Sequence, residues 1–301
     1  MHPVVLLALY SALCVVASLA GGWIPLVVRL THRRMQIAIS FVSGIILGIG
    51  VLHLVPHSLM ATGSIDSTVL WLLAGFLFMF FLERFFHFHH HDVVDDSAGA
   101  DHDHVHHEHD ECAHDHAHSP IDSPFPWAGA IVGLSLHGVV DGVAMAAAVQ
   151  VDAAHGLGGW PGLGAALAVI LHKPFDSLTI GTLMAASGRS AAQRYLFNLL
   201  YSLITPLGIL LFYLSLSEAA SGGQILGQAL GFAAGAFICI ASSDLLPELQ
   251  FHRHDRLALS VALVAGIALA WSTIYLEEGG HDHARDHEEH SHIEHHEHDH
   301  P

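Results

Sequence analysis

The chain has 301 residues, of which 52% are hydrophobic and only 13% are charged. Soluble domains carry about a quarter charged residues, so this composition excludes an ordinary soluble globular protein and favours one that crosses a membrane several times. The formal net charge is −18, and its distribution along the chain is uneven.

Eight apolar segments of about twenty residues, the length of a spanning helix, follow one another along the chain. No Lys or Arg precedes the first of them, so we interpret it as a retained helix and not as a secretory signal. We therefore predict an all-α membrane protein with eight transmembrane helices. They are predicted over residues 4–24, 37–56, 68–86, 126–149, 162–186, 195–216, 225–246 and 257–276.

Two polar segments interrupt this pattern and divide the chain into four parts. Residues 87–125 contain 12 of the 30 histidines and residues 277–301 contain nine, and together these segments carry the whole net charge of −18. Neither can bury a core, so we predict both to be disordered and to bind metal loosely. Residues 1–86 then hold spans one to three, and residues 126–276 hold spans four to eight.

The arginines predict the orientation, because short cytoplasmic loops are enriched in Lys and Arg. Eight of the nine arginines lie at the ends of spans or in loops that fall on one side of the membrane: Arg29, Arg33, Arg34, Arg84, Arg189, Arg194, Arg253 and Arg256. We predict that both termini are outside and that the His-rich loop is cytoplasmic. The predicted location is the cell (inner) membrane, as a multi-pass protein.

Spans four and five each contain a histidine and an aspartate four residues apart. These are His137 with Asp141 and His172 with Asp176. Residues at this spacing share one helix face, and ionisable groups in the middle of a span face a partner, an ion or a wet cavity. We predict that the four side chains converge between spans four and five as ligands of one divalent metal ion in transit. Two imidazoles and two carboxylates suit zinc, and also accept Fe²⁺, Mn²⁺, Co²⁺ or Cd²⁺.

Three further intramembrane residues have two interpretations each. His53, near the outer end of span two, lies on the ion pathway or bonds a neighbouring helix. Asp244, near the inner end of span seven, has an exit or gating role or caps a helix end. Lys173 is the only lysine in the chain; it forms a buried ion pair with Asp141 or Asp176, or stands where a second cation would bind.

The sequence also predicts inverted repeats. Residues 43–56 and 234–247 place a glycine, a polar residue (His53 or Asp244) and a proline at the same spacing, in spans two and seven that cross in opposite directions. The His/Asp motifs of spans four and five repeat likewise. Many secondary transporters consist of such repeats, with one half rocking or sliding against the other around a midplane site.

At this point the motifs resemble those of the ZIP (Zrt/Irt-like) metal transporters. Residues 137–145 are similar to their first signature, and residues 172–176, with Pro174, are similar to the second. The eight-span plan and the His-rich loop between spans three and four also fit. The resemblance implies a transporter that moves zinc or a similar ion into the cytoplasm, with His137, Asp141, His172 and Asp176 as transport-site ligands.

The chain departs from the two-metal pattern that the resemblance implies for many bacterial relatives. Gly138, Lys173, Thr205 and Ser243 stand where those relatives have ligands of a second metal. We therefore expect a single-metal site in which Lys173 supplies the missing positive charge.

Two other classes of function remain open from the sequence. The first is an integral-membrane zinc-dependent hydrolase, which would need an additional general base near the His/Asp cluster. The second is a non-transporting metal buffer or sensor, in which the His-rich segments would be the active parts. Besides the metal ion, we expect the lipid bilayer and a second copy of the chain in a homodimer as partners, and no nucleic acid.

Overall fold

The computed structural model describes residues 2–27, 31–86, 126–156, 159–217, 222–251 and 256–278, and in these ranges every regular element is a helix. The elements are α1 (Pro3–Val27), α2 (His32–Ile49), the π-helix η1 (Gly50–Leu54), α3 (Val55–Thr62), α4 (Ile65–Phe86), α5 (Pro126–Ala154), α6 (Leu163–Ala186), α7 (Ala191–Ser202), α8 (Ile204–Ser217), α9 (Gly222–Phe251) and α10 (Arg256–Glu278).

Eight stretches of these helices are long and apolar enough to cross a membrane, which confirms the eight spans predicted from the sequence. The second span consists of α2, η1 and α3 in succession, and the sixth consists of α7 and α8 with a break at Leu203. The predicted disordered parts, residues 87–125 and all but the first two residues of the tail 277–301, lie outside the described residues.

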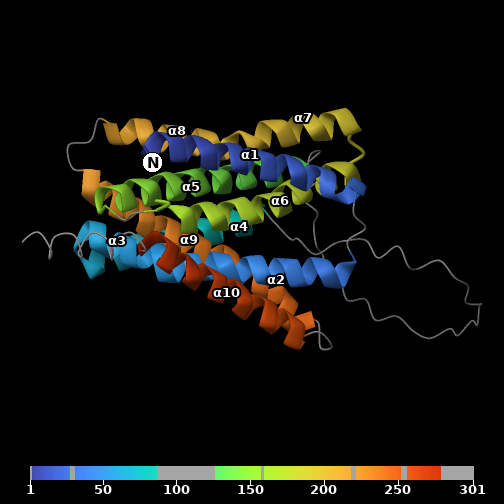
Figure 1. Ribbon diagram of the computed structural model, residues 1–301. Helices are drawn as coiled ribbons and strands as arrows, with labels where there is room; N and C mark the ends of the chain where they lie inside the picture. Colours follow the sequence, from blue (N-terminus) through green and yellow to red (C-terminus); the bar gives the residue numbers. More distant parts are fainter. Residues whose placement is uncertain are drawn as a thin grey trace, which may run out of the picture.

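The helices form two bundles that lie against each other (Figure 1). The site bundle contains α1, α5, α6, α7 and α8, which run side by side in the upper part of the view. The flanking bundle contains α2, η1, α3, α4, α9 and α10. The two bundles meet mainly where α5 packs on α9 and α6 packs on α2.

The most extensive helix pairs follow the predicted repeats. α2 packs on α10 and α4 on α9 in the flanking bundle, while α1 packs on α6 and α5 on α8 in the site bundle. Exchanging spans two with seven, three with eight, one with six and four with five converts each of these pairs into another of them. This exchange is the packing expected of two inverted repeats, whose corresponding helices meet corresponding neighbours.

Small residues let the paired helices approach closely. In α2 and α10, a Cβ atom on Gly44 would collide with the backbone of Leu263. In α4 and α9, a Cβ atom on Gly235 would collide with the backbone of Leu72. In a membrane, where the lipid is as apolar as leucine, such close van der Waals packing drives helix association.

Large apolar side chains also lie on the outer surfaces. Leu70 of α4, Leu210 of α8 and Val261 of α10 are exposed over 64%, 52% and 60% of their surface. In α5, by contrast, the four consecutive residues 144–147 are fully buried, and three of them are alanines. This arrangement suits a protein whose surroundings are hydrocarbon.

Candidate metal centre

α5 and α6 bring the predicted His/Asp residues together near the middle of both helices. His137 and Asp141 come from α5, and His172 and Asp176 come from α6. All four residues are buried, with exposed fractions of 4%, 0%, 5% and 7% of the whole residue respectively. One ligand atom from each lies within 4.8 Å of the others. The predicted convergence of these four residues, called the quartet below, is therefore present in the structure.

The distances between the donor atoms suit a small ion. Nε2 of His137 lies 3.2 Å from Nε2 of His172, and Oδ2 of Asp141 lies 3.3 Å and 3.2 Å from these two nitrogens. Oδ2 of Asp176 lies 3.7 Å and 3.9 Å from the same nitrogens. Zinc bonds of 2.0–2.2 Å in tetrahedral geometry place ligand atoms about 3.3–3.6 Å apart. The quartet thus has nearly the dimensions of a zinc coordination shell.

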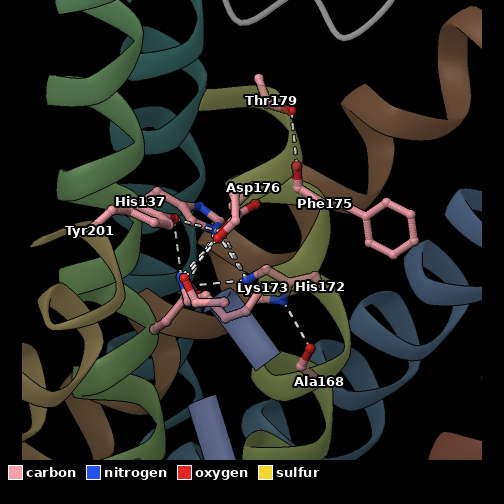
Figure 2. A network of polar contacts seen from close by, with 11 residues as sticks. His137, Ala168, His172, Lys173, Phe175, Asp176, Thr179 and Tyr201 are labelled. Atoms are coloured by element: carbon pink, nitrogen blue, oxygen red, sulfur yellow. Dashed lines mark hydrogen bonds and ion pairs between the residues drawn. The ribbon is translucent and has the colours of Figure 1, made fainter. Parts of the chain in front are cut away.

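The hydrogen bonds of the quartet leave lone pairs directed at its centre. Nδ1 of His172 lies 2.8 Å from the carbonyl oxygen of Ala168, which can only accept, so this nitrogen carries the hydrogen (Figure 2). In the neutral ring Nε2 then keeps its lone pair, the arrangement typical of a metal-binding histidine. Among the described residues, Oδ1 of Asp141 is buried and has no hydrogen-bond partner, so this carboxylate has further acceptor capacity for a cation.

Lys173 and Tyr201 complete the cluster. Nζ of Lys173, on a side chain only 2% exposed, donates to Oδ2 of Asp141 at 2.6 Å and to Oδ2 of Asp176 at 3.2 Å. The predicted buried ion pair is thus present, and it involves both carboxylates. Tyr201 of α7 donates its hydroxyl to Oδ2 of Asp176 at 2.8 Å and lies 3.4 Å from the ammonium. Tyr201 was not predicted from the sequence, because nothing in the apolar pattern of its span indicates that its hydroxyl contacts a polar site.

The turn of α6 that carries the quartet is held against α1. Pro174 lies inside α6, and Gly21 of α1 packs against its backbone so closely that a Cβ atom would collide with it. One residue after Asp176, Ser177 shares a hydrogen bond of 2.7 Å with Ser18 of α1. Phe175 points away from the cluster (Figure 2). Packing on α1 therefore fixes the orientation of this turn of α6.

The two other predicted pathway residues lie outside this cluster. His53 of η1 is buried, and its Nε2 bonds the carbonyl oxygen of Ala270 at 2.9 Å and the hydroxyl of Thr273 at 3.0 Å, both on α10. These contacts are the hydrogen bonds to a neighbouring helix that one of the two interpretations of His53 predicted. Its role on the ion pathway stays a prediction. Asp244 lies in α9, but its side chain is outside the described part of the structure.

A second His–Asp pair, which the sequence did not reveal, lies near the predicted outer end of α5. Nδ1 of His57 lies 3.2 Å from Oδ1 of Asp152, and Oδ2 of Asp152 accepts the backbone N–H of Gly162 at 2.7 Å. Asp152 is therefore placed by the turn between α5 and α6, while His57 comes from α3. The only sequence signal was an aspartate just after an apolar segment. Such a residue is equally typical of a helix end.

Three of the residues that replace second-metal ligands are placed by the structure, one beside Lys173 and two in contact with other parts of the protein. A Cβ atom on Gly138 would lie 3.5 Å from Nζ of Lys173, so the ammonium adjoins the position where a second-site ligand would start. Thr205 is buried in α8. Ser243 of α9 donates to Oε1 of Glu83 in α4 at 3.2 Å.

Comparison with known proteins agrees with the motifs. Human zinc transporter ZIP2 is 28% identical over 52% of this chain and 48% of its own length, and human zinc transporter ZIP1 is 29% identical over 49% and 43%. The chain thus spans about half the length of these two relatives. Zinc transporter ZIP9-B of Xenopus laevis is 25% identical over 83% of this chain and 86% of its own length. The family model described as ZIP zinc transporter matches residues 4–273, and the chain therefore belongs to the ZIP zinc transporter family.

Proposed function

We propose that this protein is a secondary transporter that carries zinc across a membrane through one intramembrane site, with His137, Asp141, His172 and Asp176 as the ligands. The observation that carries the proposal is the convergence of two imidazoles and two carboxylates within 4.8 Å at the centre of two apolar helices. Burying two carboxylates in the middle of a membrane costs free energy unless they bind or pair with a cation. Family membership favours transport over the hydrolase alternative, and the relatives' names indicate zinc as the substrate.

The two-bundle architecture suits alternating access. The quartet belongs to the site bundle, yet the ring of His172 lies 6.5 Å, centre to centre, from the ring of Phe237 in α9 of the flanking bundle. Phe237 is fully buried. A sliding or rocking movement of one bundle against the other would change which side of the membrane reaches the quartet, as inverted-repeat transporters do.

Direction, orientation and assembly belong to the proposal as sequence-based predictions. The termini lie outside, the His-rich loop is cytoplasmic and zinc moves inward. The protein acts in the cell (inner) membrane, as a homodimer. The loop and tail then contact the ion on opposite sides of the membrane, where their histidines capture metal before or after transport.

Selectivity follows from the ligand chemistry. Imidazole and carboxylate ligands bind zinc well but also accept Fe²⁺, Mn²⁺, Co²⁺ and Cd²⁺, so we expect these ions to compete. The absence of a thiolate from the quartet argues against a site for copper(I), which prefers soft ligands.

Zinc uptake into proteoliposomes tests the proposal. Vesicles containing the wild-type protein should accumulate radiolabelled zinc, whereas His172→Ala and Asp141→Ala should lose most of this uptake. His155→Ala is a matched control, because His155 bonds only its own helix turn at Val151 in the contacts described here and lies outside the quartet. Equal uptake by all four proteins would leave the quartet without a role.

A further inference from the structure

The ammonium of Lys173 lies on the carboxylate oxygens that a metal would need. Its Nζ atom is 2.6 Å from Oδ2 of Asp141, and this oxygen also lies 3.3 Å and 3.2 Å from the two imidazole nitrogens of the quartet. A divalent ion bound at that oxygen would repel an ammonium at contact distance, and the repulsion is strong where water is excluded. Lys173 and the metal therefore compete for Asp141.

The ammonium of Lys173 has another polar neighbour within the cluster. The hydroxyl of Tyr201, which is not a member of the quartet, lies 3.4 Å from the same Nζ atom. The ammonium also lies 5.3 Å from the centre of the Tyr201 ring, within the range of a cation–π contact. A rotation about the flexible lysine side chain would release Asp141 and keep the ammonium hydrogen-bonded.

The charges of the cluster show what this lysine changes in a transport cycle. With Lys173, the two carboxylates and the ammonium sum to −1 without metal and to +1 with a divalent ion. Without Lys173 the corresponding sums would be −2 and 0. Because the cost of burying a charge grows with its square, the metal-free carrier would cost about four times as much to occlude without the lysine. With the lysine, the net charge of the cluster therefore has the same magnitude in the loaded and in the metal-free carrier.

We propose that Lys173 is a tethered counter-cation that yields Asp141 to the incoming metal, moves toward the hydroxyl and ring of Tyr201, and returns when the metal leaves, so that the metal-free transporter can reorient. The inference rests on the proposed transport function and deepens it. It assigns Lys173 to the return step of the cycle and not to metal binding itself.

Two transport modes separate these roles. Net uptake into metal-free vesicles requires the metal-free carrier to return, whereas exchange of external labelled zinc for internal unlabelled zinc requires only the loaded carrier to cross. In Lys173→Met vesicles, the ratio of exchange to net uptake should rise tenfold or more, on the order of the penalty for one additional buried charge. The zinc dissociation constant should fall by a similar factor, because a competing cation has been removed.

Two further variants serve as controls for charge and for folding. Lys173→Arg keeps the charge and should keep the wild-type ratio. Lys173→Gln keeps a hydrogen-bond donor for the carboxylates and should behave like Lys173→Met, so that either neutral variant decides the question. The ratio is measured within one vesicle preparation and is therefore independent of the amount of folded protein.

The outcomes distinguish this inference from the function on which it rests. A neutral variant with the wild-type ratio, or with zinc bound more weakly than by the wild type, would overturn the role of Lys173 while leaving transport intact. A wild-type protein that shows neither exchange nor net uptake would instead overturn the proposed transport function.

Discussion

The ion pair between Asp141 and Lys173 gives the most quantitative prediction for the metal-free protein. The two side chains are 1% and 2% exposed and their charged atoms are 2.6 Å apart. At an effective dielectric constant of 20, Coulomb attraction over that distance is about 6 kcal/mol. Removing one member of a buried pair leaves the other charge uncompensated and costs about 3–5 kcal/mol. We therefore expect Asp141→Asn to destabilise the metal-free protein by this amount.

The size of the loss is limited by the remaining contacts. In Asp141→Asn the ammonium of Lys173 keeps Asp176 and Tyr201 as neighbours, so the lower part of the range is expected. The double variant Asp141→Asn/Lys173→Met removes both charges and should recover most of the lost stability, because replacing a whole buried pair is far cheaper than breaking it.

Reversible unfolding in detergent without metal, followed for the wild type, both single variants and the double variant, measures this coupling. The result expected is a positive recovery in the double variant of several kcal/mol. Single variants within about 0.5 kcal/mol of the wild type, or a double variant as unstable as the sum of the two, would show that the pair does not hold the cluster together.

Three further predictions concern other parts of the chain. Gly235→Leu should prevent the close approach of α9 to the backbone of Leu72 and lower stability by at least about 3 kcal/mol. Gly181→Ala is the control and should be tolerated, because its Cβ atom would enter open space. Thermal unfolding compares the two variants, and equal stability would contradict the close packing of α4 on α9. His53→Leu should remove the imidazole from the carbonyl of Ala270, which keeps the hydroxyl of Thr273 at 2.7 Å, and should lower stability by about 0.5–1.5 kcal/mol in the same assay. An unchanged melting temperature would show that this bond between η1 and α10 contributes nothing. Deleting residues 92–118 and 281–300, which include most of the chain's histidines, should preserve basal zinc uptake in proteoliposomes, and complete loss of uptake would favour the metal buffer.

The fold was predictable in its main features because a bilayer restricts a chain to few solutions. A spanning segment must satisfy its backbone internally over about 30 Å, so an apolar run of the right length can only be a helix. Pro3–Val27 and Leu163–Ala186 accordingly begin and end close to the predicted limits. The sequence did not reveal the π-helix Gly50–Leu54 or the break at Leu203, because these depend on how neighbouring helices pack and not on hydrophobic length.

The candidate site was predictable where its residues share a helix and not where they come from distant elements. The spacing of His137 and Asp141, and of His172 and Asp176, places each pair on one face before any tertiary contact exists. Tyr201 reaches the cluster only because α7 packs on α6. The contact between His57 and Asp152 likewise depends on how α3 meets the end of α5.

Anomalous diffraction at the zinc absorption edge, from crystals of the wild-type protein grown with zinc, would show directly whether the quartet binds one zinc ion. We expect a single peak among the helices, about 2.0–2.2 Å from donor atoms of His137, Asp141, His172 and Asp176, with the ammonium of Lys173 displaced from Asp141. Two peaks between these helices, or a single peak that none of the four side chains contacts, would contradict this expectation.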